Sequence, residues 1–271
     1  MAEKTVRIAT LRKMKSESRP IVVLTAYDAP SARIADEAGV DVLLVGDSLG
    51  NVLLGYDDTI PVTLDAMIHH TAAVARARPK ALVVADMPFM TYHLSAEQAL
   101  ANAGRLIQEG GAEAVKLEGG ATVAPTIARI TDAGIPVMGH LGLTPQSIHQ
   151  LSGYRVQGRD TSACERLLDD ARALCQAGCF AIVLELTTDE LTRAITEAVD
   201  CPTIGIGAGA GADGQVLVLH DMLGLTFGAA PRFVKRYADL RATMTDAIAA
   251  YCREVRDGAY PDESHTYHQD A

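Results

Sequence analysis

Polar side chains that could bind a metal ion or move a proton follow short apolar runs at five places in the chain. These side chains are Asp47 and Ser48, Asp86, Lys116 and Glu118, His140, and Glu185. A single aspartate and serine after an apolar run would be read as a helix cap or a turn. Five polar groups at the same point of consecutive units are poorly explained as caps and indicate a common site.

The carboxylates of this set are suited to a hard cation. Oxygen donors without a cysteine partner favour Mg2+, or Mn2+, which keeps several waters and binds an oxygen-rich substrate. We expect Asp47 and Asp86 to be the metal ligands, with Glu118 binding directly or through a water. Lys116 would add a fixed positive charge for a carboxylate or enolate oxygen, although an ion pair with Glu118 at a barrel rim is the alternative.

This set of side chains could form an enolate. A divalent ion chelated by a carboxylate and the adjacent carbonyl lowers the cost of removing the neighbouring proton. Glu185 follows the apolar residues 182–184, and burial at a barrel mouth would raise the pKa of such a carboxyl and make it a suitable base. His140 is the competing base, or a donor to the substrate.

The polar groups belong to a regular alternation of short apolar runs and helical segments. The runs predict eight strands, at 21–25, 42–45, 81–85, 114–117, 137–139, 181–184, 203–206 and 216–219. Single strands alternating with helices imply right-handed crossovers and a parallel sheet. Eight such units in 271 residues favour a closed α/β barrel, a (β/α)8 TIM barrel, in which the carboxyl ends of all strands meet on one face.

Further segments flank the eight units. A helix is expected at residues 8–15, before the first strand, and more helices at 231–255, after the last. The connection at 207–215 is too short for an ordinary helix. We therefore expect one barrel domain, 1–256, followed by a polar tail at 257–271.

Composition restricts the class of protein. Hydrophobic residues make up 48% of the chain but aromatics only 4%, so the core must be aliphatic. The net charge of -10 disfavours nucleic acid and anionic membranes as partners. Residues 1–19 lack the apolar run of a signal peptide, and no apolar segment approaches the roughly 18 residues of a membrane span. The five cysteines form no Cys-x-x-Cys pair. A cytoplasmic protein without a disulfide framework is expected.

The glycine-rich segment 205–211 superficially matches a dinucleotide-binding loop. It occurs late in the chain, and neither a strand-helix unit of suitable length nor a ribose-binding acid follows at the required spacing. Close backbone approach in a tight barrel loop, lining the pocket of a second substrate, is the better interpretation.

Several segments, in order along the chain, resemble one enzyme family. They are Thr25-Ala-Tyr-Asp28, Val45-Gly-Asp-Ser-Leu-Gly50, Pro61-Val-Thr63, Ala85-Asp-Met-Pro-Phe89, Val115-Lys-Leu-Glu-Gly-Gly120, Gly139-His-Leu-Gly-Leu-Thr-Pro-Gln146, Gly153-Tyr-Arg-Val-Gln-Gly158, Gly205-Ile-Gly-Ala-Gly209 and Asp213-Gly-Gln-Val-Leu-Val218. Together they resemble the ketopantoate hydroxymethyltransferase family. The sequence departs from the family after Glu185, where Leu186-Thr-Thr188 replaces Val-Pro-like residues.

The resemblance implies a barrel of the phosphoenolpyruvate/pyruvate type that uses Mg2+. Such an enzyme transfers a hydroxymethyl group from 5,10-methylenetetrahydrofolate to 3-methyl-2-oxobutanoate and yields 2-dehydropantoate for pantothenate and coenzyme A synthesis. By position, it places the metal ligands at Asp47 and Asp86, with Glu118 close to the ion. It places keto-acid contacts at Ser48, Lys116 and His140, and the base at Glu185. It also implies a large homo-oligomer, often a decamer.

Two other functions are compatible with the strand-end residues. Another metal-dependent carbon-carbon lyase or aldolase of the same barrel type could use the same enolate. A catalytically inactive scaffold barrel would be expected to have lost at least one of the convergent groups, and all of them are present here.

Overall fold

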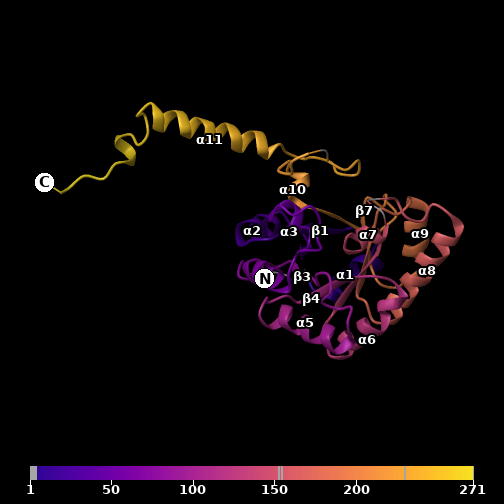
Figure 1. Cartoon of the computed structure of the whole chain (residues 1–271). Helices are drawn as coiled ribbons and strands as arrows, with labels where there is room; N and C mark the ends of the chain where they lie inside the picture. The colour runs from indigo at the N-terminus through magenta and orange to yellow at the C-terminus, as the bar shows by residue number, and fades with distance from the viewer. Residues whose placement is uncertain (1–4, 152, 154, 229, 271) are drawn as a thin grey trace. The chain divides into compact units, whose positions relative to one another are not determined.

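The protein is described by a computed structural model that covers residues 5–151, 153, 155–228 and 230–270. Tyr154 of the family-like segment 153–158 and Ala271 of the predicted tail lie outside the described residues. Eight parallel strands close into a barrel in the order β1 to β8, with β8 paired to β1 (Figure 1). The strands are β1 (Ile21–Thr25), β2 (Val42–Val45), β3 (Leu82–Asp86), β4 (Ala114–Glu118), β5 (Val137–Gly142), β6 (Ala181–Glu185), β7 (Thr203–Ile206) and β8 (Gly214–Leu217). The predicted eight-stranded α/β barrel is confirmed.

Helices connect most of the strands (Figure 1). They are α1 (Ile8–Ser16), α2 (Ala29–Glu37), α3 (Leu49–Val52), α4 (Leu64–Ala75), α5 (Ala96–Gln108), α6 (Ala124–Asp132), α7 (Ile148–Leu151), α8 (Thr161–Gln176), α9 (Asp189–Ala198), α10 (Leu219–Met222) and α11 (Leu240–Arg256). Several helices begin at a residue whose side chain accepts a hydrogen bond from a backbone N–H of the first turn. These N-cap residues are Asp28, Thr63, Ser95, Asp160 and Thr188. Among the described residues no helix is long and apolar enough to cross a membrane.

The chain divides into two compact units, Met1–Leu219, which contains the barrel, and His220–Ala271, which contains α11. The single barrel domain at 1–256 and the tail beginning at residue 257 stay predictions. Within 257–270 the chain forms a short 3-10 turn, Glu263–His265, capped by Asp262.

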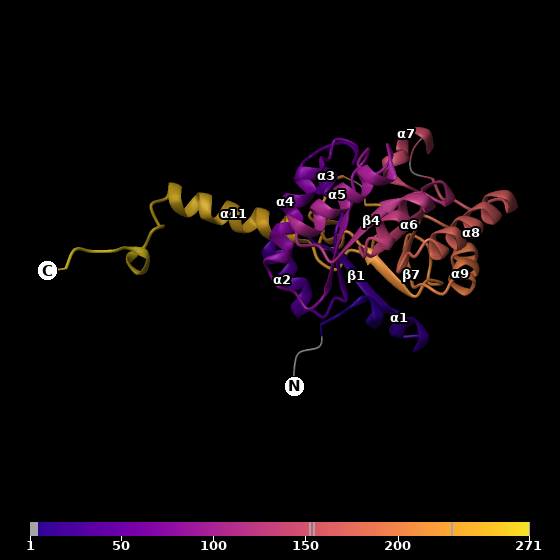
Figure 2. The same cartoon turned by 90° about the horizontal axis from the view of Figure 1, so that it is seen from below.

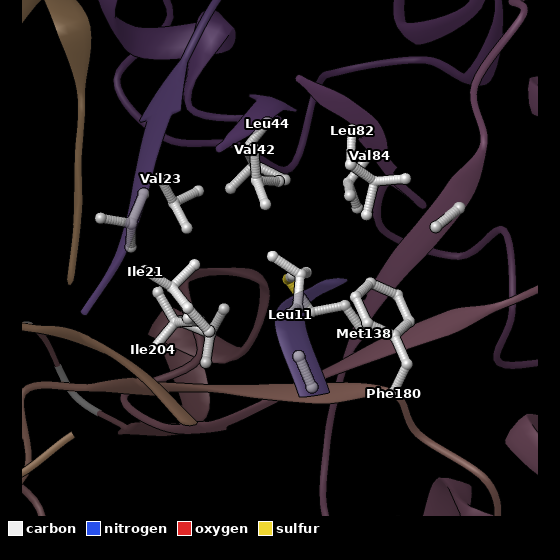
Figure 3. Close-up of a cluster of buried hydrophobic side chains, with 14 of the residues drawn as sticks. Leu11, Ile21, Val23, Val42, Leu44, Leu82, Val84, Met138, Phe180 and Ile204 are labelled. Carbon is white, nitrogen blue, oxygen red and sulfur yellow. The ribbon is translucent and has the colours of Figure 1, made fainter. Parts of the chain in front are cut away.

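Helix α1 fills the amino end of the barrel. Figure 3 shows Leu11 surrounded by inward side chains from β1, β2, β3, β5 and β7. Figure 2 shows α1 at the end of the barrel away from α3 and α7, which follow the carboxyl ends of β2 and β5. Leu11 is 0% exposed and Met14 is 2% exposed. The expected extra N-terminal helix therefore closes one end of the barrel and leaves the other end for a site.

Shortening Leu11 should destabilise the barrel. We expect Leu11→Ala to lower the free energy of unfolding by about 3 kcal/mol, because removing a buried leucine loses its transfer free energy and leaves a cavity. Urea denaturation followed by circular dichroism measures this change. Leu94→Ala, at a position that is 67% exposed, is the matched control and should have little effect; equal losses in both variants would contradict the assigned role of Leu11.

The structure corrects two predicted boundaries. The last strand begins at Gly214 rather than at residue 216, and Leu219 already starts α10. Gly214 pairs with Ile21 and Ile204, and a Cβ on it would lie 2.4 Å from the carbonyl oxygen of Ile21. Glycine is therefore required at this position, although glycine in a sequence does not indicate a strand. The predicted helix at 231–255 is wrong for residues 231–239, because α11 begins only after Asp239 caps Ala242 N.

Candidate active site

The polar groups of strands β3 to β6 form the last inward-facing layer of the barrel. Alternate residues of a strand face the same side, so Asp86 faces the interior of the barrel, as Leu82 and Val84 of the core do. In the same way Ala114 is followed by Lys116 and then Glu118. His140 follows Met138 on β5, and Glu185 follows Ala181 and Val183 on β6. The period of the strands therefore places charged groups directly above the apolar core.

Strand register pairs these charges across neighbouring strands. Asp86 is paired in register with Lys116, and the Lys116 Nζ to Asp86 Oδ1 distance is 2.5 Å. Both side chains are at most 5% exposed. Burial by itself lowers the pKa of Lys116, but the charges of Asp86, Glu118 and Asp47 outweigh it and raise that pKa above its ordinary value. Lys116 is therefore a permanent cation.

Asp47 lies in the turn after β2, against Asp86. Its backbone N–H donates to Asp86 Oδ2 at 3.0 Å. A Cβ on the preceding Gly46 would lie 2.8 Å from Ser48 Oγ and 3.5 Å from Asp86 Oδ2, so glycine permits this close approach. Burial raises the pKa of Asp47 well above its ordinary value, and the charges of Asp86 and Glu118 add to the shift. The centre therefore holds more negative charge than Lys116 alone compensates.

His140 lies between two carboxylates. Its Nδ1 is 3.4 Å from Glu118 Oε1, and its Nε2 is 3.2 Å from Glu185 Oε2. Burial by itself lowers the pKa of His140 and so does Lys116, but the contacts with Glu118 and Glu185 outweigh both and raise the pKa to about 9. His140 is consequently an imidazolium at neutral pH, while Glu185, whose side chain is 15% exposed, reaches the mouth of the barrel.

The charge on His140 makes the stability of the metal-free protein depend on pH. Because its folded-state pKa of about 9 lies above the unfolded value of about 6.5, its stabilising contribution is complete below about pH 6.5. That contribution should be lost as the pH rises through the folded-state value. Comparing urea denaturation at pH 6 and pH 9 for wild type, His140→Asn and the exposed control His149→Asn measures it. A His140→Asn protein with the pH dependence of wild type would contradict the assignment.

Ser48 is held from a neighbouring strand end. The hydroxyl groups of Ser48 and Tyr27 are 2.9 Å apart, and the Tyr27 carbonyl oxygen is 2.8 Å from His70 Nδ1. Ser48 occupies the N-cap position of α3 but makes no side-chain capping bond there. The structure thus assigns its hydroxyl to the barrel mouth rather than to the helix.

Two residues that the sequence interpretation did not select, Tyr92 and Gln146, lie beside the carboxylates. Gln146 Nε2 donates to Asp47 Oδ2 at 2.8 Å, and Tyr92 Oη donates to Gln146 Oε1 at 2.6 Å. Both side chains are buried. Burial raises the pKa of Tyr92 above its ordinary value, and the charge of Glu118 adds to it, so the phenol stays neutral. Gln146 ends the family-like segment 139–146, but a glutamine after Thr-Pro carries no chemical signal of its own.

The backbone turns sharply after Glu185. Leu186 has φ of 46°, in the left-handed region that a side chain with a Cβ occupies only at a cost. Its N–H donates to the Ile206 carbonyl at 2.9 Å, and its carbonyl accepts from Gln157 N at 2.7 Å. The first residue of the segment that departs from the family pattern is therefore anchored through both its N–H and its carbonyl, directly after Glu185.

The glycine-rich segment after β7 packs against the start of α9. Asp189 Oδ1 accepts bonds from Ala210 N at 2.8 Å and Gly211 N at 3.1 Å. A Cβ on Gly209 would lie 2.2 Å from that same carboxylate oxygen. Close backbone approach is confirmed as one reason for these glycines, whereas their contact with a second substrate stays a prediction.

Known proteins resemble this chain along nearly its whole length. The sequence profile described as ketopantoate hydroxymethyltransferase matches residues 5–263. A 3-methyl-2-oxobutanoate hydroxymethyltransferase from a Thermoanaerobacter species is 58% identical over 98% of this chain and 97% of its own. The protein of the same name from Geobacter metallireducens is 56% identical over 96% of this chain and 97% of its own.

Solved structures share the fold at low sequence identity. Phosphonopyruvate hydrolase in complex with oxalate and Mg++ gives a TM-score of 0.62 at 14% identity, covering 96% of this chain and 93% of the other. A 2,3-dimethylmalate lyase, a member of the PEP mutase/isocitrate lyase superfamily, gives 0.59 at 18% identity, covering 96% and 91%. This likeness confirms the barrel fold, whereas its phosphoenolpyruvate/pyruvate type stays a prediction. With the profile match and the relatives of high identity, these findings show that the chain belongs to the ketopantoate hydroxymethyltransferase family of transferases.

Proposed function

We propose that this enzyme transfers a hydroxymethyl group from 5,10-methylenetetrahydrofolate to 3-methyl-2-oxobutanoate with the help of Mg2+. The product would be 2-dehydropantoate, for pantothenate and coenzyme A synthesis. The observation that carries the proposal is the cluster of three buried carboxylates, Asp47, Asp86 and Glu118, beside one buried lysine and one buried histidine. The names of the relatives support the hydroxymethyl transfer to this keto acid.

The donor set fits a hard divalent cation. Burial raises the pKa of Asp47, and the nearby charges of Asp86 and Glu118 raise it further; a cation bound among these carboxylates would relieve both effects. Among the described residues no group of three or more His, Cys, Asp or Glu side chains is placed to hold a metal ion by itself, so waters and substrate oxygens would have to complete the coordination. Mg2+ commonly binds through one or two carboxylates together with waters and substrate oxygens. Asp47 and Asp86 would therefore hold it, with Glu118 reaching it directly or through a water; Mn2+ suits the same donors.

When bound, such a cation would act as a Lewis acid that polarises the keto group and stabilises the developing negative charge. Lys116, a permanent cation, and Ser48, held by Tyr27, would contact the carboxylate and keto oxygens of the substrate. Glu185 would remove the proton from C3. His140 lies between Glu118 and Glu185, 3.2 Å from Glu185 Oε2, so we assign it to orienting Glu185 and donating to the substrate rather than to proton removal. Water would release the one-carbon unit of the folate as formaldehyde and leave tetrahydrofolate, and the enolate would add to that carbon, whose oxygen takes up a proton and becomes the new hydroxyl group.

Proton exchange tests this proposal. The C3 proton of 3-methyl-2-oxobutanoate should exchange with deuterium in the presence of enzyme and Mg2+, as measured by NMR, and 2-dehydropantoate should form only when 5,10-methylenetetrahydrofolate is added. Exchange that persists without a divalent ion would exclude the metal-assisted mechanism. Cleavage of a keto acid without any folate requirement would instead support the lyase alternative.

Replacing the base should separate proton removal from binding. We expect Glu185→Gln to slow C3 exchange by about 10²-fold or more, because a positioned general base contributes 10²- to 10⁴-fold, while Mn2+ affinity changes little. NMR exchange rates and Mn2+ titration measure the two quantities, and Glu165→Gln on the exposed surface of α8 is the control. A larger loss in His140→Asn than in Glu185→Gln would reassign the base to His140.

The expected large homo-oligomer, of the decameric kind found in the family, remains a proposal. The lack of nucleic-acid or membrane partners, inferred from the acidic composition, is likewise a proposal, and so is the cytoplasmic location. Sedimentation velocity at several protein concentrations would measure the assembly directly.

A further inference from the structure

Gln146 connects two of the three buried carboxylates. Its backbone N–H donates to Glu118 Oε2 at 3.0 Å, and its side-chain Nε2 donates to Asp47 Oδ2 at 2.8 Å and to the Met87 carbonyl at 3.0 Å. The residue is 4% exposed. One residue therefore holds an oxygen of Asp47 and an oxygen of Glu118 at the same time.

The amide of Gln146 has one favourable orientation. Tyr92 Oη accepts from Glu118 N at 3.3 Å, so its single proton is available for Gln146 Oε1, 2.6 Å away. Turning the amide over would direct its NH2 group at the tyrosine hydroxyl and its oxygen at the Asp47 carboxylate. Two hydrogen-bond acceptors, Gln146 Oε1 and the Asp47 carboxylate, would then face each other in a buried site, which would cost free energy. Tyr92 therefore keeps the amide donor aimed at Asp47.

The backbone around Gln146 is short and constrained. Gln146 is the middle residue of the 3-10 helix Pro145–Ser147, which Thr144 precedes in an extended conformation. Ser147 N donates to the Thr144 carbonyl at 2.9 Å, and the proline ring fixes its own φ. This turn projects the backbone N–H and the side-chain amide of one residue toward two different acids.

Gln146 is also uncharged. A lysine or arginine in its place would neutralise Asp47 and compete with a cation for it. A neutral donor fixes Asp47 Oδ2 and leaves the net charge of the carboxylate unchanged. This is the arrangement by which groups around a metal site orient the metal ligands.

We propose that Gln146, kept in its orientation by Tyr92, is a positioning residue that sets Asp47 and Glu118 for the divalent cation. The inference rests on the proposed function, because it assumes that these carboxylates bind a cation. The inference adds that tight cation binding requires the side-chain amide of Gln146, which the proposed cation site alone does not imply.

Direct binding of Mn2+ to the metal-free full-length protein tests the inference. Free Mn2+ is counted by electron paramagnetic resonance in titrations of wild type, Gln146→Met and Tyr92→Phe. Gln146→Met keeps nearly the same side-chain volume and the backbone bond to Glu118, and it removes only the amide. We expect it to weaken Mn2+ binding by about 10- to 100-fold, the usual cost of losing such a partner, and Tyr92→Phe to weaken it less. Gln176→Ala and Tyr237→Phe, both at exposed positions, should bind as wild type does.

The outcomes separate the inference from the proposed function. A wild type that binds no Mn2+ removes the metal part of the proposed function. A wild type that binds Mn2+ together with a folded Gln146→Met protein of unchanged affinity overturns the inference while leaving the proposed function intact. If Gln146→Met does not fold, Tyr92→Phe decides: unchanged Mn2+ affinity in that variant overturns the inference, and weakened binding with an unchanged melting temperature supports it.

Discussion

Asp47→Asn should nearly abolish metal-dependent exchange of the C3 proton of 3-methyl-2-oxobutanoate while leaving the barrel folded. Lewis-acid stabilisation is worth several kcal/mol, and each 1.36 kcal/mol is a factor of ten in rate. Losing one of two metal-binding carboxylates should therefore slow exchange by roughly three to four orders of magnitude. NMR exchange rates at saturating Mg2+ measure this loss.

The same substitution should stabilise the metal-free protein. The pKa of Asp47 is raised by burial and by the charges of Asp86 and Glu118. A carboxyl whose pKa is higher in the folded state costs stability as the pH rises above its unfolded value of about 4. Asparagine has nearly the same shape, can still accept the bond from Gln146, and carries no charge. The melting temperature of metal-free Asp47→Asn at neutral pH should therefore exceed that of wild type.

Asp132→Asn, at an exposed position on α6, is the matched control and should alter neither property. A destabilised Asp47→Asn protein would indicate that Asp47 serves the fold. Unchanged exchange in a folded variant would remove Asp47 from the metal site.

Lys116→Met should destabilise the protein by about 3–5 kcal/mol. Removing one member of a buried ion pair leaves the other charge without compensation, and losses of this size are typical. Here the uncompensated group is Asp86, whose side chain is 3% exposed. For a domain of this size each kcal/mol lowers the melting temperature by about 2–4 °C, so a decrease of roughly 10 °C is expected in a thermal scan of the metal-free protein.

A double variant distinguishes lost charge from lost packing. Lys116→Met combined with Asp86→Asn removes both charges and should recover much of the stability, because an uncharged pair of similar volume has no ionic desolvation cost. No recovery in the double variant would attribute the loss to packing. Neither protein should support C3 exchange, since both lack groups assigned to cation and substrate binding.

The sequence predicted the barrel well because its signals are local. Each strand from β1 to β7 is a mainly apolar run that ends at, or directly before, a polar or glycine residue. The period-two alternation carries Asp86, Lys116, Glu118, His140 and Glu185 to one face. Strand β8 was misplaced because it begins Gly214-Gln215, where backbone contact with Ile21 takes the place of an apolar side chain. The residues from 231 to 239 were misassigned to a helix because apolar content there does not reveal the cap at Asp239.

The part of the site that the sequence did not predict consists of neutral residues. Tyr92 and Gln146 are 54 positions apart, and their bond depends on how two loops fold over the barrel mouth. A carboxylate, lysine or histidine at the end of a buried strand indicates a functional site. A tyrosine or glutamine in a loop does not, because it has many structural uses. The protonation of His140 was also open, because it depends on its distances to Glu118 and Glu185 rather than on residue type. The catalytic roles themselves remain predictions.

The polar groups of the site divide between two kinds of support. Asp86, Lys116, Glu118, His140 and Glu185 belong to strands, whereas Asp47, Ser48, Tyr92 and Gln146 lie in the segments that follow them. Strands hold side chains more precisely than loops do, and barrels of this type change their chemistry mainly through their loops. The proposed base is thus built into the rigid frame, while one proposed metal ligand, Asp47, and its supporting residue Gln146 lie in the exchangeable parts. Grafting new loops that retain Asp47 and Gln146 onto this frame should alter which keto acid or one-carbon donor is accepted before it alters the ability to make an enolate.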